Sequence, residues 1–189
     1  MKFFTLENYR AAYDDDDPED WKTFKRACDA SLAYLQELRV RYPSNVWEIA
    51  EPFFVDDALV AKVRFDRKMQ RMEIVLRCGN LLTAYFDLVF RYEGVEISHE
   101  SEFALATVAR ATKTCRLFWG HHCYVHELDL LADGRFVHHF LFHPGLCITI
   151  LSSSLSWERI PRPDRKLPRS KDRFPGGPPT PPPSIDAFD

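Results

Sequence analysis

The chain has 189 residues, of which 46% are hydrophobic and 28% charged, and its formal net charge is −3. No stretch approaches the roughly 20 consecutive apolar residues of a membrane-spanning helix, and the chain lacks the basic excess of a nucleic-acid-binding domain. Five cysteines, an odd number with no Cys-x-x-Cys pair, favour reduced thiols over a secreted disulfide framework, so we expect a cytoplasmic protein that binds neither membrane nor nucleic acid.

The first predicted helix begins at an acidic run. Residues 14–20, DDDDPED, contain six acids and no base: Asp14, Asp15, Asp16, Asp17, Glu19 and Asp20. Asp17 is a suitable cap, Pro18 suits the first helical position, and acids favour the positive end of the helix dipole. Apolar residues then recur at helical spacing on one predicted face: Trp21, Phe24, Cys28, Leu32, Leu35 and Leu38. The acidic run therefore has two interpretations, a helix start and an electrostatic surface for a partner.

Beyond Pro52 the apolar period changes from about 3.6 to 2, which indicates strands. The predicted strands cover residues 59–66, 72–78, 84–92, 116–131, 135–142 and 145–151, and residues 95–98 are predicted as a continuation of the third or as a separate short strand. A second helix is predicted over residues 101–112, where Ser101 is a possible cap. Successive strands joined by short turns predict an α+β fold, an antiparallel meander sheet with a long N-terminal helix and a second helix packed on it.

The composition changes near the C-terminal end. Residues 159–173 carry seven bases against two acids, and most of the prolines lie from Pro161 onward. Such a segment has too few apolar residues to form a core. We therefore predict a single α+β domain over residues 1–158 and a disordered tail over 159–189, basic at first and then proline-rich.

Six of the seven histidines lie between residues 120 and 145. Asp133 and Gly134 predict a two-residue hairpin turn. That turn places Leu128 opposite His139, His126 opposite Leu141, Tyr124 opposite His143 and Asp129 opposite His138. One face of the hairpin would then carry Tyr124, His126, His139 and His143, in half-exposed positions.

This predicted hairpin does not form a simple metal cage. His122 and His126 are four residues apart, which along a strand separates their Cβ atoms by roughly 13 Å. Only diagonal pairs, His126 with His139 or with His143, come within roughly 7–8 Å, and no third ligand is evident. Motifs for nucleotide binding, hydrolysis or zinc binding are missing from the sequence. We therefore predict a non-enzyme, with no catalytic residue, no metal ligand and no cofactor.

Several stretches resemble a group of small bacterial proteins classed as a domain of unknown function: MKFFTLENYR, FFVDDALVAKVRFD, FDLVFRYEGVEI and CYVHELDLLADGRFVHHFLF. The resemblance spans roughly residues 1 to 150. Where that group shows His-Asp-Ala before the first strand, this chain has Val55, Asp56, Asp57 and Ala58. The resemblance implies the fold and a bacterial origin, and it carries over no catalytic residue.

The predicted function is non-enzymatic protein binding, in the manner of an immunity or antitoxin-like protein that sequesters a partner protein. The predicted partner-binding residues are Asp14, Asp15, Asp16, Asp17, Glu19, Asp20, Tyr124, His126, His139 and His143. The alternative is a metal-dependent enzyme or metal sensor that uses the histidine-rich hairpin. A structural subunit that self-associates through an unpaired strand edge is a third possibility.

Overall fold

The computed structural model describes residues 1–5, 7, 18–50, 55, 57–80, 84–111, 122–143 and 145–162. The elements in chain order are α2 (Pro18–Leu38), α3 (Ser44–Trp47), β1 (Leu59–Asp66), β2 (Arg71–Asn80), β3 (Ala84–Glu93), β4 (Glu96–Ile97), α4 (His99–Ala111), β5 (Cys123–Leu130), β6 (Phe136–Phe142), β7 (Leu146–Ser152) and β8 (Ser154–Arg162). Of the predicted features, Asp14, Asp15, Asp16 and Asp17 and the tail beyond residue 162 lie outside the described residues.

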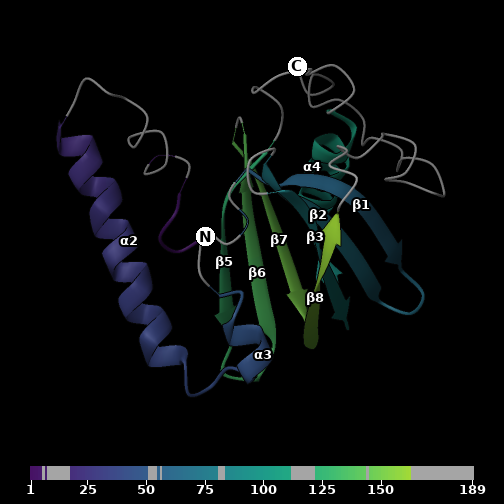
Figure 1. The fold of residues 1–189 in the computed structure, drawn as a ribbon. Coiled ribbons are helices and arrows are strands. Elements are labelled where there is room, and N and C mark those ends of the chain that lie inside the picture. Colours follow the sequence, from purple (N-terminus) through teal and green to yellow (C-terminus); the bar gives the residue numbers. More distant parts are fainter. Residues whose placement is uncertain are drawn as a thin grey trace, which may run out of the picture.

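The predicted α+β class, with antiparallel sheets and an N-terminal helix, is confirmed. The strands form two four-stranded sheets in the orders β1-β2-β3-β8 and β4-β7-β6-β5, so the single meander sheet is wrong (Figure 1). Strand β8 continues to Arg162, so residues 159–162, which the composition assigns to the tail, belong to a strand. Pro161 is tolerated there because β8 is an edge strand, where a missing backbone donor costs little.

The division into two sheets occurs at Gly94 and Ser153. β3 passes into β4 across Gly94, and β7 passes into β8 across Ser153. The Ser153 amide donates to the Glu93 carbonyl over 2.9 Å, which holds the two bends side by side. Gly94 has a φ of 59, and a Cβ atom there would collide with the Ser153 side chain. A glycine is therefore required where the β3–β8 ladder turns into the β4–β7 ladder.

The inner faces of both sheets share one core. Its largest fully buried side chains include Phe90 and Tyr92 from β3, Phe140 from β6 and Ile148 from β7. Helix α4 packs against β7 and β1, and α3 packs against β8. Helix α2 lies beside β5, on the other side of its sheet from the core (Figure 1). Among the described residues, no helix combines the length and apolar character that crossing a membrane requires.

Candidate functional site

The histidine-rich hairpin of β5 and β6 turns through three residues, where two are predicted. The Leu131 amide donates to the Arg135 carbonyl over 2.8 Å, and the Gly134 amide donates to the Leu131 carbonyl over 3.1 Å. Gly134 has a φ of 87, in the left-handed region. This is the three-residue loop that ends in a left-handed residue, so the predicted two-residue turn at Asp133 and Gly134 is wrong.

The extra loop residue shifts the register of the whole hairpin by one position. The structure pairs His126 with Phe140, Glu127 with His139, Leu128 with His138 and Asp129 with Val137. The predicted pairs of Leu128 with His139, His126 with Leu141 and Asp129 with His138 are therefore wrong. Because side chains alternate between the two faces, a shift of one residue exchanges the faces of one strand. His126 consequently shares its face with His138 and not with His139.

His126 and His138 lie inside the core with no solvent exposure. The Nδ1 atom of His126 is 2.8 Å from Nε2 of His138, and Nδ1 of His138 is 2.9 Å from the Tyr92 hydroxyl oxygen. Tyr92 belongs to β3, so these three side chains connect the two sheets across the core. The prediction of a half-exposed position for His126 is wrong, because the ring is enclosed by the core.

Burial keeps the side chains of Tyr92 and His138 uncharged. It lowers the pKa of His138 well below the ordinary value, and the charges of His126 and His139 lower that pKa further. Burial raises the pKa of Tyr92. A neutral imidazole has one nitrogen that donates and one that accepts, so His138 donates to one of its two neighbours, Tyr92 and His126, and accepts from the other. We assign this set a structural role, because it gives buried polar atoms the partners that they need.

His139 lies on the opposite face of the sheet, toward α2. Its Nδ1 atom is 2.9 Å from the Thr149 hydroxyl oxygen, and burial lowers the pKa of His139. The ring borders a small cavity of about 30 Å³ between the sheet and α2, which Glu127 and Asp129 also line. A cavity of this size holds about one or two water molecules, so it suits ordered water and not an organic ligand.

Tyr124 and His143 meet at the end of the hairpin that is remote from its loop. The predicted ladder pair is replaced by a hydrogen bond between the Tyr124 hydroxyl and Nδ1 of His143, next to an irregularity in the pairing of β5. The rings of His122 and His143 are parallel within 2°, with centroids 5.6 Å apart, and Nε2 of His122 is 3.6 Å from the Asp57 carboxylate. Ring nitrogens bind in the ring plane, so two stacked rings do not converge on one ion.

The metal-binding alternative depends on pairs that the structure does not form. His126 contacts His138 in the core, whereas His139 lies on the outer face of the same sheet. Within the part of the chain that the structure describes, no group of three or more His, Cys, Asp or Glu side chains is arranged to hold a metal ion. The hairpin therefore gives no observation that favours a metal-dependent function.

Helix α2 carries two large exposed apolar side chains on one flank, which we call the docking flank: Trp21, 58% exposed, and Leu32, 50% exposed. They are 11 residues apart, about three helical turns, and so lie on the same side of the helix. The periodicity assigns both to the buried face, and this prediction is wrong. The buried stripe keeps Leu35 and Leu38 of the predicted face, and it contains Ala27 and Ser31 where Trp21 and Leu32 were expected. Sequence reasoning missed Ala27 and Ser31 because small side chains add little to an apolar pattern. Their small size is nevertheless a signal of close packing.

The C-terminal half of α2 is anchored to the sheet. The Tyr34 hydroxyl donates to the Asp129 carboxylate over 2.6 Å, and the Tyr42 hydroxyl, beyond the helix end, donates to the Leu128 carbonyl over 2.6 Å. Burial and the hydrogen bond to Asp129 together raise the pKa of Tyr34 to about 12. Both hydroxyls therefore remain protonated donors at neutral pH.

Of the predicted acidic residues, Glu19 forms an ion pair with Lys22 in the first turns of α2, and Asp20 follows Glu19 in the sequence.

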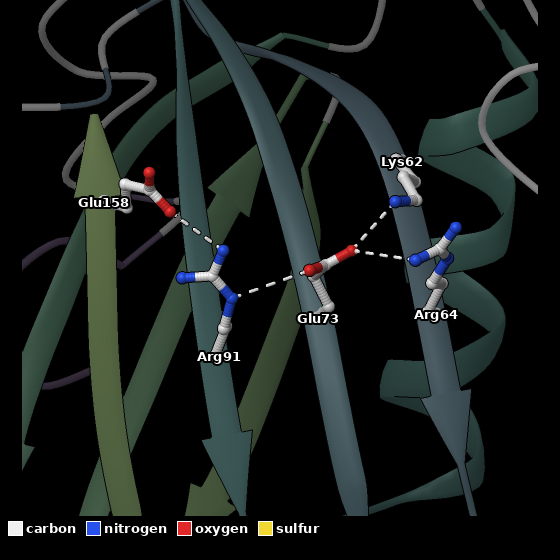
Figure 2. Close-up of polar contacts among 5 residues, drawn as sticks. All are labelled: Lys62, Arg64, Glu73, Arg91 and Glu158. Atoms are coloured by element: carbon white, nitrogen blue, oxygen red, sulfur yellow. Dashed lines mark hydrogen bonds and ion pairs between the residues drawn. The ribbon is translucent and has the colours of Figure 1, made fainter. Parts of the chain in front are cut away.

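A cluster of charged side chains covers part of the outer face of sheet β1-β2-β3-β8, as Figure 2 shows. The Glu73 carboxylate is 2.9 Å from Lys62, 3.8 Å from Arg64 and 3.6 Å from Arg91, and Arg91 is 2.9 Å from Glu158. Partial burial alone raises the pKa of Glu73, but the hydrogen bond from Lys62 and the three positive charges outweigh it, so the pKa lies below its ordinary value. Each carboxylate of the cluster has a cation beside it, so the cluster ties four strands together.

Comparisons with known proteins were made for the whole chain. No family model, no curated protein and no solved structure matches it. The resemblance to a bacterial domain of unknown function therefore stays a prediction.

Proposed function

We propose that this chain is a protein-binding module of the immunity or antitoxin-like kind, and that its partner protein docks on the flank of α2 that carries Trp21 and Leu32. The observation that carries the proposal is the exposure of the Trp21 side chain, more than half of which is open to solvent. Exposed tryptophan is costly to leave in water and is enriched among the residues that dominate binding energies at protein interfaces. Leu32 extends the same apolar surface along the helix.

The charge next to the docking flank indicates the kind of partner. Glu19 lies on the first turns of α2, and the sequence before it is acidic without interruption from Asp14 to Asp17. Opposite charge accelerates encounter and disfavours partners of the wrong charge. The partner should therefore present an apolar pocket for Trp21 beside a basic surface.

The attachment of α2 to the sheet supports this role. Tyr34 and Leu35 fix one end of the helix, through the hydrogen bond to Asp129 and through burial. A helix that is already ordered loses little conformational entropy when a partner binds it. The proposed partner surface does not include His126, because this side chain is buried in the core. We propose in addition that the protein acts in the cytoplasm, without catalysis and without nucleic acid.

Site-specific photo-crosslinking tests the proposal. The full chain, with a benzoylphenylalanine in place of Trp21, is expressed in its native host, and a second chain with the same group in place of Val40 is the control, because Val40 is 91% exposed but lies off the docking flank. We expect one dominant crosslinked protein from position 21. The same protein should be absent from the crosslinked products of position 40. The purified partner should then bind Trp21→Ala about thirtyfold more weakly and Leu32→Ala several-fold more weakly, with Val40→Ala unchanged.

Two outcomes would overturn the proposal. One is a crosslinked protein whose affinity for Trp21→Ala equals that for the unmodified chain. The other is equal crosslinking from positions 21 and 40, which would mean that capture reflects exposure alone. Replacement of Asp14 to Asp17 by asparagine should slow association without changing dissociation, and added salt should reduce the difference.

A further inference from the structure

Residues 1–5 form a strap between α2 and the outer face of the sheet that contains β5. The Glu127 carboxylate on β5 accepts hydrogen bonds from three successive backbone amides of the strap: Lys2 over 2.5 Å, Phe3 over 2.8 Å and Phe4 over 2.6 Å. Glu127 is only 7% exposed. A buried carboxylate is tolerated only when its oxygens are hydrogen-bonded, so the carboxylate and the strap stabilise each other.

The strap reaches the docking flank through aromatic contacts. Phe4 is fully buried and packs on Val125 from β5. Its ring centroid lies 6.1 Å from that of Phe24 on α2, and the ring centroids of Phe24 and Trp21 are 5.8 Å apart. An unbroken series of contacts therefore runs from Glu127 through Phe4 and Phe24 to Trp21.

We propose that Glu127 is a positioning residue for the docking flank, which it controls through the strap; this inference rests on the proposed function of α2. The hydrogen bond between Tyr34 and Asp129 attaches the C-terminal half of the helix directly to β5, although the Tyr34 ring also contacts Lys2 and Phe3 of the strap. The N-terminal half has its contact with the strap where Phe24 packs on Phe4. When Glu127 holds the strap, Phe4 sets the direction of the N-terminal half of α2 and the orientation of Trp21. When the strap is released, α2 remains attached at one end and the docking flank loses its fixed geometry.

The experiment labels the full chain with 5-fluorotryptophan and records fluorine NMR spectra. The chain has four tryptophans, and Trp21→Phe identifies the Trp21 signal. Glu127→Gln is the main variant, because its amide group places a donor against the strap amides. Glu73→Gln is the control, because Glu73 lies in the other sheet and its loss tests for an unspecific effect of removing a charge. Amide hydrogen exchange of residues 2–4 is measured on the same samples.

We expect Glu127→Gln to accelerate exchange at residues 2–4 by about tenfold, as the loss of one charge-assisted hydrogen bond implies. The Trp21 signal should shift or broaden while the Trp157 signal on β8 stays in place. Glu73→Gln should change neither, and Glu127→Asp should partly restore both. If Glu127→Gln does not fold, Phe4→Leu keeps the apolar packing and removes the ring contact to Phe24, and it should move the Trp21 signal.

Fast exchange at residues 2–4 with an unchanged Trp21 signal would overturn the inference, since the strap would then be free without any effect on the flank. This result is separate from the fate of the proposed function. If the purified partner binds Trp21→Ala normally, the proposed function fails, whatever the Trp21 signal does in Glu127→Gln. If Trp21→Ala loses the partner and Glu127→Gln binds it with unchanged affinity, the function stands and the positioning role fails.

Discussion

His126 and His138 face each other across β5 and β6, with Nδ1 of the first 2.8 Å from Nε2 of the second, and neither ring reaches solvent. Two of the histidines that suggest chemistry in the sequence therefore lie in the core. Their contact also makes the stability of the fold sensitive to acid. Burial lowers the pKa of His138 in the folded state and lowers that of His139 as well.

The first prediction concerns the free energy of unfolding between pH 7.5 and 5. In the unfolded chain a histidine has a pKa of about 6.5, so below that pH the unfolded state binds more protons than the folded state. The contribution of these histidines to the free energy of unfolding is complete above about pH 6.5. It falls as the pH decreases, by up to about 1.4 kcal/mol per pH unit for each proton. Urea titrations at several pH values measure this slope. His138→Gln should be less stable at pH 7.5 and show a shallower slope, and an unchanged slope would contradict the assignment.

The second prediction concerns Tyr92→Phe. The substitution keeps the buried ring and removes the hydroxyl that lies 2.9 Å from Nδ1 of His138. His138 then has an unpaired buried nitrogen, so we expect a loss of about 1–3 kcal/mol in the free energy of unfolding. Tyr85→Phe on the same strand is the control, because Tyr85 is half-buried at the strand's other end. Equal effects of the two substitutions in urea titrations would show that the contact with His138 contributes nothing.

The fold class could be predicted from the sequence because strand periodicity and helix punctuation are local signals. Apolar and polar residues alternate over residues 59–66, and this stretch forms β1 with the same bounds. Pro43, which marks the predicted end of the first helix, follows the end of α2 closely. The division into two sheets could not be predicted from such signals. It depends on Gly94 and Ser153, which are far apart in the sequence and adjacent in the fold.

The candidate site was less predictable because it depends on register and on small residues. A two-residue and a three-residue loop both fit Asp133 and Gly134, and the choice between them decides which histidines share a face with His126. On α2, apolar periodicity alone cannot show whether Trp21 lies on the buried stripe or beside it. Ala27 and Ser31 decide this through close contact with the rest of the protein.

The third prediction concerns the charged cluster around Glu73. Glu73→Gln leaves Lys62, Arg64 and Arg91 close together without their shared carboxylate. We therefore expect the free energy of unfolding to fall by about 1 kcal/mol at low salt and by less at high salt. The pKa of Glu73 is lowered in the folded state, so its stabilisation is present above its unfolded pKa of about 4.5 and disappears as the pH falls further. Glu158→Gln, which removes the partner of Arg91 alone, should cost less. The reverse order in chemical denaturation would contradict the central position of Glu73.

The fourth prediction compares two glycines that share a positive φ but differ in the space around them. Gly94 has a φ of 59 and no room for a Cβ atom beside Ser153, whereas Gly134 has a φ of 87 and nothing within 4 Å of that position. Gly134→Ala should cost only the backbone strain, about 1 kcal/mol. Gly94→Ala adds a collision at the bend that joins the two sheets, and it should cost about 2–4 kcal/mol in thermal or urea unfolding. Ser153→Gly removes the colliding side chain, so it should recover part of the loss in the Gly94→Ala background. If Gly94→Ala costs no more than Gly134→Ala, the close contact with Ser153 does not constrain the bend.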